Sequence, residues 1–217
     1  MFLGTLTTRR LEVDTNTEHN WFFRNLANLI TLTGFPMCFV LLWVVVLHRE
    51  RTLTMLLLVT GVLLTDLFDG LVARYFGTAS DLGGALDRLR DKLLLGIVFL
   101  FLILDGRIHL TLKMITVPLA VVETALLVYW FKGVRRKLDV SAGGWGKRKM
   151  NLLVAGILLC LLNIIVEERW GPEYNLISTI VLNALFVVSL FFGVKSFLGH
   201  KADYLKKLSA KLEGKDE

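Results

Sequence analysis

Long runs of apolar residues alternate with short polar stretches along this chain. Six of these runs reach roughly 20 residues, the length that a helix needs to cross a bilayer. They predict transmembrane helices near residues 29–47, 53–76, 86–104, 108–131, 150–166 and 176–197. Because the connections between the runs are short, we expect one compact domain over residues 28–198. The predicted fold class is therefore an all-α integral membrane protein with six transmembrane helices.

The two ends of the chain differ from these runs. Residues 1–27 have no apolar core of the signal-peptide kind, and Trp21, Phe22 and Phe23 suit the headgroup level of a bilayer. This stretch predicts an N-terminal interfacial amphipathic segment. Residues 199–217 are polar and partly helical in period, which predicts a cytoplasmic tail.

Composition and charge support a membrane protein. Of the 217 residues, 54% are hydrophobic, and the mean hydropathy is +0.60, which is too apolar for an ordinary soluble domain. With six crossings, 20 of the 25 Lys and Arg residues fall on the side of the termini. The positive-inside rule then places both termini in the cytoplasm of a multi-pass protein of the cell (inner) membrane. Topology therefore explains the net charge of +6, and we expect no nucleic-acid partner.

Five aspartates lie at and between the adjoining ends of the second and third runs. Two sets of residues there follow helical spacing: Asp66, Asp69, Gly70, Ala73 and Arg74 on one helix, and Gly83, Asp87 and Asp91 on the next. If the two faces turn toward each other, four carboxylates converge between helices whose small residues permit close approach.

Four carboxylates in one pocket within a membrane could not all remain ionised without cations, because burial and mutual repulsion raise their pKa values. Two divalent ions would balance the four charges, and oxygen ligands favour Mg²⁺ or Mn²⁺. Two such ions form a clamp for displacement at phosphorus. Asp66 lies about 20 Å along its predicted crossing, which is near the phosphates of a lipid in the inner leaflet. The alternative, solvated charges paired with Arg74, Arg88 and Arg90, does not explain why Asp66 and Asp69 lie so deep.

The pattern Asp66-x2-Asp69-Gly70-x2-Ala73-Arg74-x8-Gly83-x3-Asp87-x3-Asp91 resembles the signature of the CDP-alcohol phosphotransferase (CDP-alcohol phosphatidyltransferase) family. The resemblance implies that an alcohol hydroxyl attacks the β-phosphate of CDP-diacylglycerol and releases CMP. It implies that Asp66, Asp69 and Asp87 bind the metal ions and that Asp91 is both a ligand and the general base. It also implies homodimerisation and a CDP-lipid site formed by Asn28, Thr31, Gly70, Arg74, Ser80 and Gly83.

Two further stretches resemble the phosphatidylglycerophosphate synthase branch of that family. These are "LDRLRDKLLLG", residues 86–96, and "GKRKM", residues 146–150. Arg88 and Arg90 stand where that branch usually has Pro and Ala, and Met150 stands where it has Thr.

The basic residues Lys147, Arg148, Lys149 and Arg135 favour an anionic acceptor. Glycerol 3-phosphate and inositol phosphate both satisfy this expectation. The positive-inside rule accounts for the same residues equally well.

Two other function classes are compatible with an acidic cluster in a membrane. A divalent-cation transporter would be expected to have broken helices or repeated halves, and neither is visible in the sequence. An inactive scaffold would have no reason to keep all eight signature positions.

Glu123, Asn163 and Asn183 are polar residues within predicted spans, and we expect them to pair helices within the bundle or across a dimer.

Overall fold

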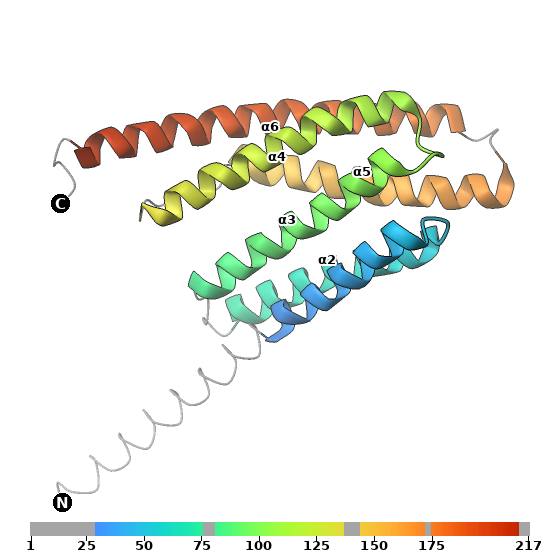
Figure 1. Cartoon of the computed structure of the whole chain (residues 1–217), viewed down its shortest axis with the longest axis horizontal. Coiled ribbons are helices and arrows are strands. Elements are labelled where there is room, and N and C mark those ends of the chain that lie inside the picture. Colours follow the sequence, from blue (N-terminus) through green and yellow to red (C-terminus); the bar gives the residue numbers. More distant parts are fainter. Residues whose placement is uncertain (1–28, 76–80, 137–143, 172–174, 213–217) are drawn as a thin grey trace, which may run out of the picture. The chain divides into compact units, whose positions relative to one another are not determined.

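The computed structural model describes residues 29–75, 81–136, 144–171 and 175–212, and all regular structure in these ranges is helical (Figure 1). The helices are Leu29–Leu47, α2 (Thr52–Tyr75), α3 (Asp81–Leu104), α4 (Leu110–Arg135), α5 (Gly144–Trp170) and α6 (Asn175–Leu212). The predicted all-α fold class is confirmed. The predicted interfacial segment, residues 1–27, lies outside the described residues.

Five of the described helices are long and apolar enough to cross a membrane, as a multi-pass membrane protein requires. Large apolar side chains such as Phe39, Val121 and Phe191 are more than half exposed on them, which suits contact with lipid. Helix α3 has 24 residues and is also long enough. Charged residues fill its first turns, so it is not among the five, and the sixth crossing stays a prediction.

Local sequence explains where several helices begin and end. His109 caps the start of α4, where its side chain accepts a hydrogen bond from the backbone N–H of Thr111. Gly171 follows α5 with a φ of 91°, a left-handed conformation that glycine adopts without strain and that commonly ends helices. Its N–H donates to the carbonyl of Glu167 at 3.0 Å, which closes the last turn of α5.

Helix α6 continues well beyond its apolar run. It has 38 residues and includes most of the segment that we predicted as a polar tail. Tyr204 is buried there and packs edge-on against Tyr129 of α4, with ring centroids 5.6 Å apart. This packing on α4 stabilises the extension, which lacks proline and contains a single glycine, Gly199.

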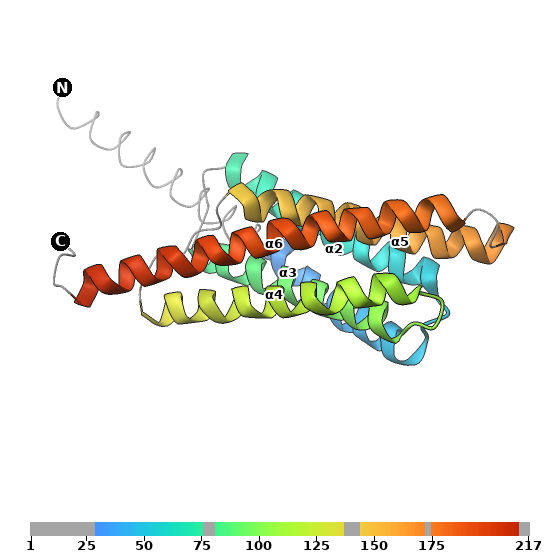
Figure 2. The ribbon, with the colours of Figure 1, turned by 90° about the horizontal axis from the view of Figure 1, so that it is seen from above.

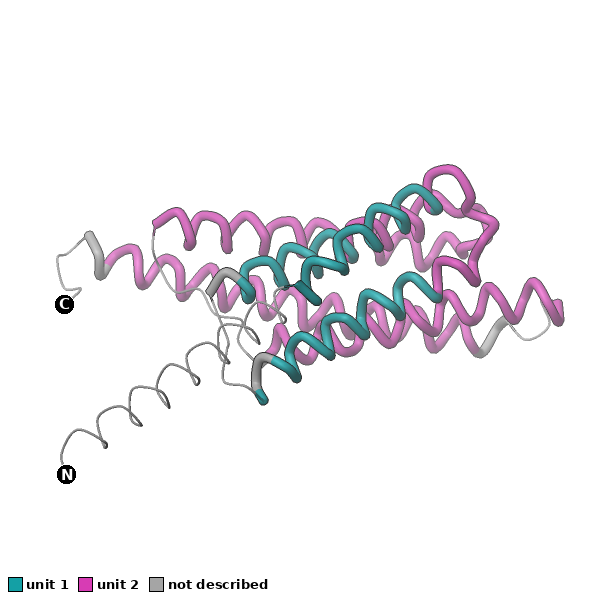
Figure 3. Tube along the Cα trace, turned by 90° about the horizontal axis from the view of Figure 1, so that it is seen from below, with its two compact units in different colours: residues 1–44, 57–94 teal, residues 45–56, 95–217 magenta. Residues whose placement is uncertain are grey.

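The chain divides into two compact units (Figure 3). Unit 1 comprises residues 1–44 and 57–94, so its described part consists of segments of helix Leu29–Leu47, α2 and α3. Its buried side chains include Cys38, Leu41, Val59 and Val62.

Unit 2 comprises residues 45–56 and 95–217 and contains α4, α5 and α6. Helix α6 packs against both α4 and α5, and it lies beside them in both views (Figures 1 and 2). Gly156 of α5 allows this close approach, because a Cβ there would lie 2.8 Å from the ring of Phe186. Leu119, Leu153 and Phe186 are fully buried between these helices.

A polar network in unit 2 joins the ends of several helices. Arg107 pairs with Asp105 at 2.5 Å and also with Glu168 at the end of α5. Its guanidinium donates to the hydroxyl of Thr52 at 3.0 Å and to the carbonyl of Arg49 at 2.7 Å. One side chain thus holds the connections before α2 and after α3 to the end of α5.

Candidate active site

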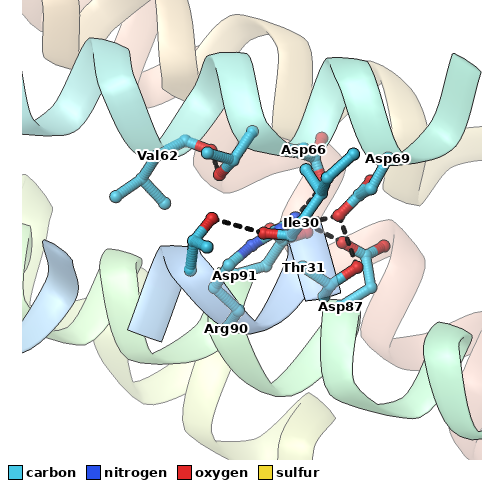
Figure 4. Close-up of polar contacts among 10 residues, drawn as sticks. Ile30, Thr31, Val62, Asp66, Asp69, Asp87, Arg90 and Asp91 are labelled. Atoms are coloured by element: carbon cyan, nitrogen blue, oxygen red, sulfur yellow. Dashed lines mark hydrogen bonds and ion pairs between the residues drawn. The ribbon is translucent and has the colours of Figure 1, made fainter. Parts of the chain in front are cut away.

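Three helices of unit 1 bring polar side chains together at one place (Figure 4). Asp66 and Asp69 come from α2, whereas Asp87, Arg90 and Asp91 come from α3. Thr31, in helix Leu29–Leu47, completes the group. We call Asp66, Asp69, Asp87 and Asp91 the aspartate cluster.

Arg90 lies at the centre of the aspartate cluster and is fully buried. Its Nη1 donates to Oδ2 of Asp69 at 2.9 Å, and its Nη2 donates to Oδ1 of Asp87 at 2.5 Å and to Oδ1 of Asp66. The nearest oxygen of Asp91 lies 3.9 Å from Nη2. One guanidinium therefore touches or approaches all four carboxylates.

Thr31 orients one of these carboxylates. Its hydroxyl donates a hydrogen bond of 2.6 Å to Oδ2 of Asp69, the oxygen that also accepts from Arg90. Because Asp69 is buried and has two donors, its carboxylate is fixed more firmly than the half-exposed carboxylates of Asp66 and Asp87.

The aspartate cluster has the donor set that a hard divalent cation requires. Asp66, Asp69 and Asp87 each offer an oxygen, and the three oxygens lie within 4.8 Å of one another. With all four aspartates ionised, the cluster carries four negative charges against the single positive charge of Arg90. The remaining negative charge is uncompensated within the cluster, so these residues fit a bound Mg²⁺ or Mn²⁺.

Space for Arg90 is provided by a glycine on the neighbouring helix. A Cβ on Gly34 would lie 2.4 Å from Cδ of Arg90 and 3.3 Å from Oγ1 of Thr65. Any larger residue at position 34 would therefore have to displace the stem of Arg90.

Arg90 is the residue of this site that our sequence analysis did not assign. The signal was present, because Gly83, Asp87, Arg90 and Asp91 follow a spacing of i, i+4, i+7 and i+8 on one helical face. The positive-inside rule already accounts for a basic residue at the end of a predicted span, so this spacing did not lead us to place Arg90 in the site.

The other predicted site residues are distributed more widely. Asn28 and Ser80 lie outside the described residues, and Arg74 is described only by its place on α2. Gly70 and Gly83 lie on the same helices as the aspartates.

The predicted acceptor residues Arg135, Lys147, Arg148 and Lys149 all belong to unit 2. Lys149 of α5 is buried and forms an ion pair with Glu123 of α4. Glu123 therefore pairs helices within the bundle, which is one of the two roles that we expected for it.

Arg135 lies beside an aromatic and basic groove of unit 2. The cavity has a volume of about 720 Å³ and is lined by Tyr129, Lys132, Arg135, Arg136, Tyr204, Leu205 and Leu208. Arg136 lies over the ring of Tyr204, 5.6 Å from its centroid. On α5, Arg148 lies 5.2 Å from the ring centroid of Trp145. These cations suit an anionic ligand.

Comparison with known proteins agrees with this arrangement. Residues 24–194 match the model of the CDP-alcohol phosphatidyltransferase family. The chain is also 27% identical over 176 residues, 78% of each chain, to proteins named "Probable phosphatidylglycerophosphate synthase" from Mycobacterium tuberculosis strains CDC 1551 and H37Rv. No solved structure matches the chain significantly. Because the family model covers most of the sequence, including all four aspartates, this chain belongs to the CDP-alcohol phosphatidyltransferase family and is a membrane-embedded transferase.

Proposed function

We propose that this enzyme transfers the phosphatidyl group of CDP-diacylglycerol to a phosphorylated alcohol and releases CMP. The observation that carries the proposal is the convergence of Asp66, Asp69 and Asp87 with Asp91 beside them. Glycerol 3-phosphate is the acceptor that we favour, giving phosphatidylglycerophosphate. The names of the two mycobacterial relatives support this choice, and inositol phosphate is the alternative.

The proposed reaction is a displacement at phosphorus. The acceptor hydroxyl forms a bond to the β-phosphorus of CDP-diacylglycerol while the bond from that phosphorus to the CMP oxygen breaks. Asp91 takes the hydroxyl proton, and CMP leaves with the electron pair. Asp66, Asp69, Asp87 and Asp91 would hold two divalent ions, whose positive charge stabilises the phosphate oxygens and the leaving group.

The remaining residues would bind the two substrates. Arg74 offers a guanidinium to the diphosphate, and Gly70 and Gly83 leave room for it. Asn28 and Ser80 would line the nucleotide. Thr31 remains one of the proposed CDP-lipid-binding residues. Its hydrogen bond to Asp69 would also orient that carboxylate as a metal ligand.

The phosphate of the acceptor needs basic residues of its own. Arg135, Lys147 and Arg148 are exposed and remain our candidates. Lys149 is a weaker candidate than the sequence suggested, because its ammonium is buried against Glu123. We further propose that the protein acts as a homodimer in the cell (inner) membrane, with both termini and the active site on the cytoplasmic side.

The test is an assay of the purified protein with CDP-diacylglycerol, Mg²⁺ or Mn²⁺, and a panel of acceptors. We expect CMP release with glycerol 3-phosphate and none in the presence of EDTA. Asp91→Asn should lower the rate about 100-fold or more, because it removes the proposed base. Asp203→Asn, a charge change at a half-exposed position of α6, is the control and should keep full activity. Absence of CMP release with every acceptor would refute the transferase proposal, and ion flux in proteoliposomes would then favour a transporter.

A further inference from the structure

The guanidinium of Arg90 occupies the space between the carboxylates that the proposed function assigns to metal ions. Asp66 and Asp87 both accept from the same nitrogen, Nη2, and Asp69 accepts from Nη1. A divalent ion held by these carboxylates would lie about 2.0–2.6 Å from its oxygen ligands. An ion at the centre of these carboxylates would have to displace the guanidinium, which already lies between them.

We propose that Arg90 is a resident cation of the aspartate cluster and competes with a divalent ion for one of the cation positions. This inference rests on the proposed metal dependence of the enzyme. With Arg90 in place, one of the two ions of the proposed site binds more weakly than it would in a cluster without this side chain. Arg90 thereby sets the metal affinity of this enzyme and keeps the acidic pocket folded at low metal concentration.

The surrounding residues accommodate the side chain of Arg90 in a buried position. Arg90 is fully buried, and Gly34 provides room for its stem. Three carboxylates from two helices accept from its outer nitrogens, so the contact does not resemble the exposed pairing of charges at the end of a span.

In this buried position, one polar atom of the Arg90 side chain lacks a hydrogen bond. Within the described residues, the buried Nε has no hydrogen-bond partner. A buried donor without an acceptor lowers the stability of that arrangement. The guanidinium is thus held well enough to balance charge and is incompletely bonded, as expected of a group that exchanges with another cation.

Competition makes a definite prediction for metal binding. Where a site is blocked most of the time, the apparent dissociation constant rises by the inverse of the open fraction. Removal of Arg90 should therefore tighten binding of Mn²⁺ by about tenfold or more, or add one ion per chain.

The experiment is a calorimetric titration of the purified full chain with MnCl₂, in detergent and without substrates. The variants are Arg90→Ala, Arg90→Lys and Arg88→Ala. Arg88 is the matched control, because it lies two residues earlier on α3, is exposed, and loses the same charge. Melting temperatures in EDTA and in excess MnCl₂ supply a second measurement that does not depend on activity.

We expect Arg90→Ala to bind Mn²⁺ more tightly or in greater number, and to gain more thermal stability from Mn²⁺ than the parent protein gains. Arg88→Ala should behave like the parent protein. Arg90→Lys should fall between the two, because a compact ammonium reaches fewer carboxylates. If Arg90→Ala fails to fold, the measurements on Arg90→Lys test the inference instead.

Unchanged or weaker Mn²⁺ binding in both Arg90 variants would overturn the inference. That result would leave the proposed function intact if the parent protein still releases CMP from CDP-diacylglycerol. Conversely, tighter binding in Arg90→Ala with no CMP release from any acceptor would support the competition and refute the transferase reaction.

Discussion

At the scale of single residues, Gly34 shows how a missing side chain shapes the aspartate cluster. A Cβ there would press on Cδ of Arg90, a buried atom between a helix backbone and a guanidinium held by carboxylates. We expect Gly34→Ala to lower the free energy of unfolding by about 1–3 kcal/mol. Thermal unfolding in detergent measures the effect.

Two other glycines provide controls for this substitution. A Cβ on Gly61 would meet only the methyl and sulfur at the end of the Met37 side chain, which moves easily, and a Cβ on Gly96 would meet nothing within 4 Å. Gly61→Ala should therefore cost little, and Gly96→Ala should be neutral or stabilising by up to about 1 kcal/mol. Equal losses for Gly34→Ala and Gly96→Ala would show that the stem of Arg90 is not confined.

At the scale of the helices, the pair of Lys149 and Glu123 connects α5 to α4. Both side chains are buried in an apolar environment, where a charge that has lost its opposite charge is costly. Glu123→Gln should lower the free energy of unfolding by about 3 kcal/mol. The double substitution Glu123→Leu and Lys149→Met should restore part of the loss.

A half-exposed ion pair on α6 serves as the comparison. Lys207 and Asp203 lie 3.0 Å apart at positions i and i+4, and Asp203→Asn should cost less than about 1 kcal/mol. If the double substitution at positions 123 and 149 were as unstable as Glu123→Gln, the pair would not act as a unit.

At the scale of the whole molecule, the Arg107 network predicts a response to acid. Burial alone would raise the pKa of Asp105, but hydrogen bonds from the side chain and backbone of Arg107 lower it below its ordinary value of 3.8. A carboxyl with a lowered pKa contributes stability above the ordinary value and loses it as the pH falls through the pKa of the folded state. The melting temperatures of the parent protein and Asp105→Asn should therefore differ most near pH 7 and converge below about pH 4. A gap independent of pH would contradict this assignment.

The proposed orientation in the membrane is a second prediction at this scale. Glu50, before α2, and Lys201, in the C-terminal part of α6, are both exposed. The native Cys38 and Cys160 are buried and should react slowly with an impermeant maleimide. In intact cells we expect labelling of Glu50→Cys, and labelling of Lys201→Cys only after permeabilisation, because the basic excess should lie in the cytoplasm. The reverse labelling pattern would show that the protein has the opposite orientation in the membrane.

Much of this protein follows from local sequence. Apolar runs of bilayer length determine the helices, and the helical period determines that Asp66 and Asp69 share one face of α2 while Asp87 and Asp91 share one face of α3. The helix ends were harder to predict, because Tyr204 stabilises the last turns of α6 through packing on another helix.

The tertiary structure alone decided which cations these acids meet. Arg90 and Lys149 both stand among basic residues that topology explains, as do exposed neighbours such as Arg88 and Arg148, so the helical spacing of Arg90 was not enough to assign it to the site. Burial separates them: Arg90 turns into the aspartate cluster and Lys149 turns toward Glu123. Such pairings depend on how helices are rotated against one another, which contacts between distant residues fix and the local pattern does not.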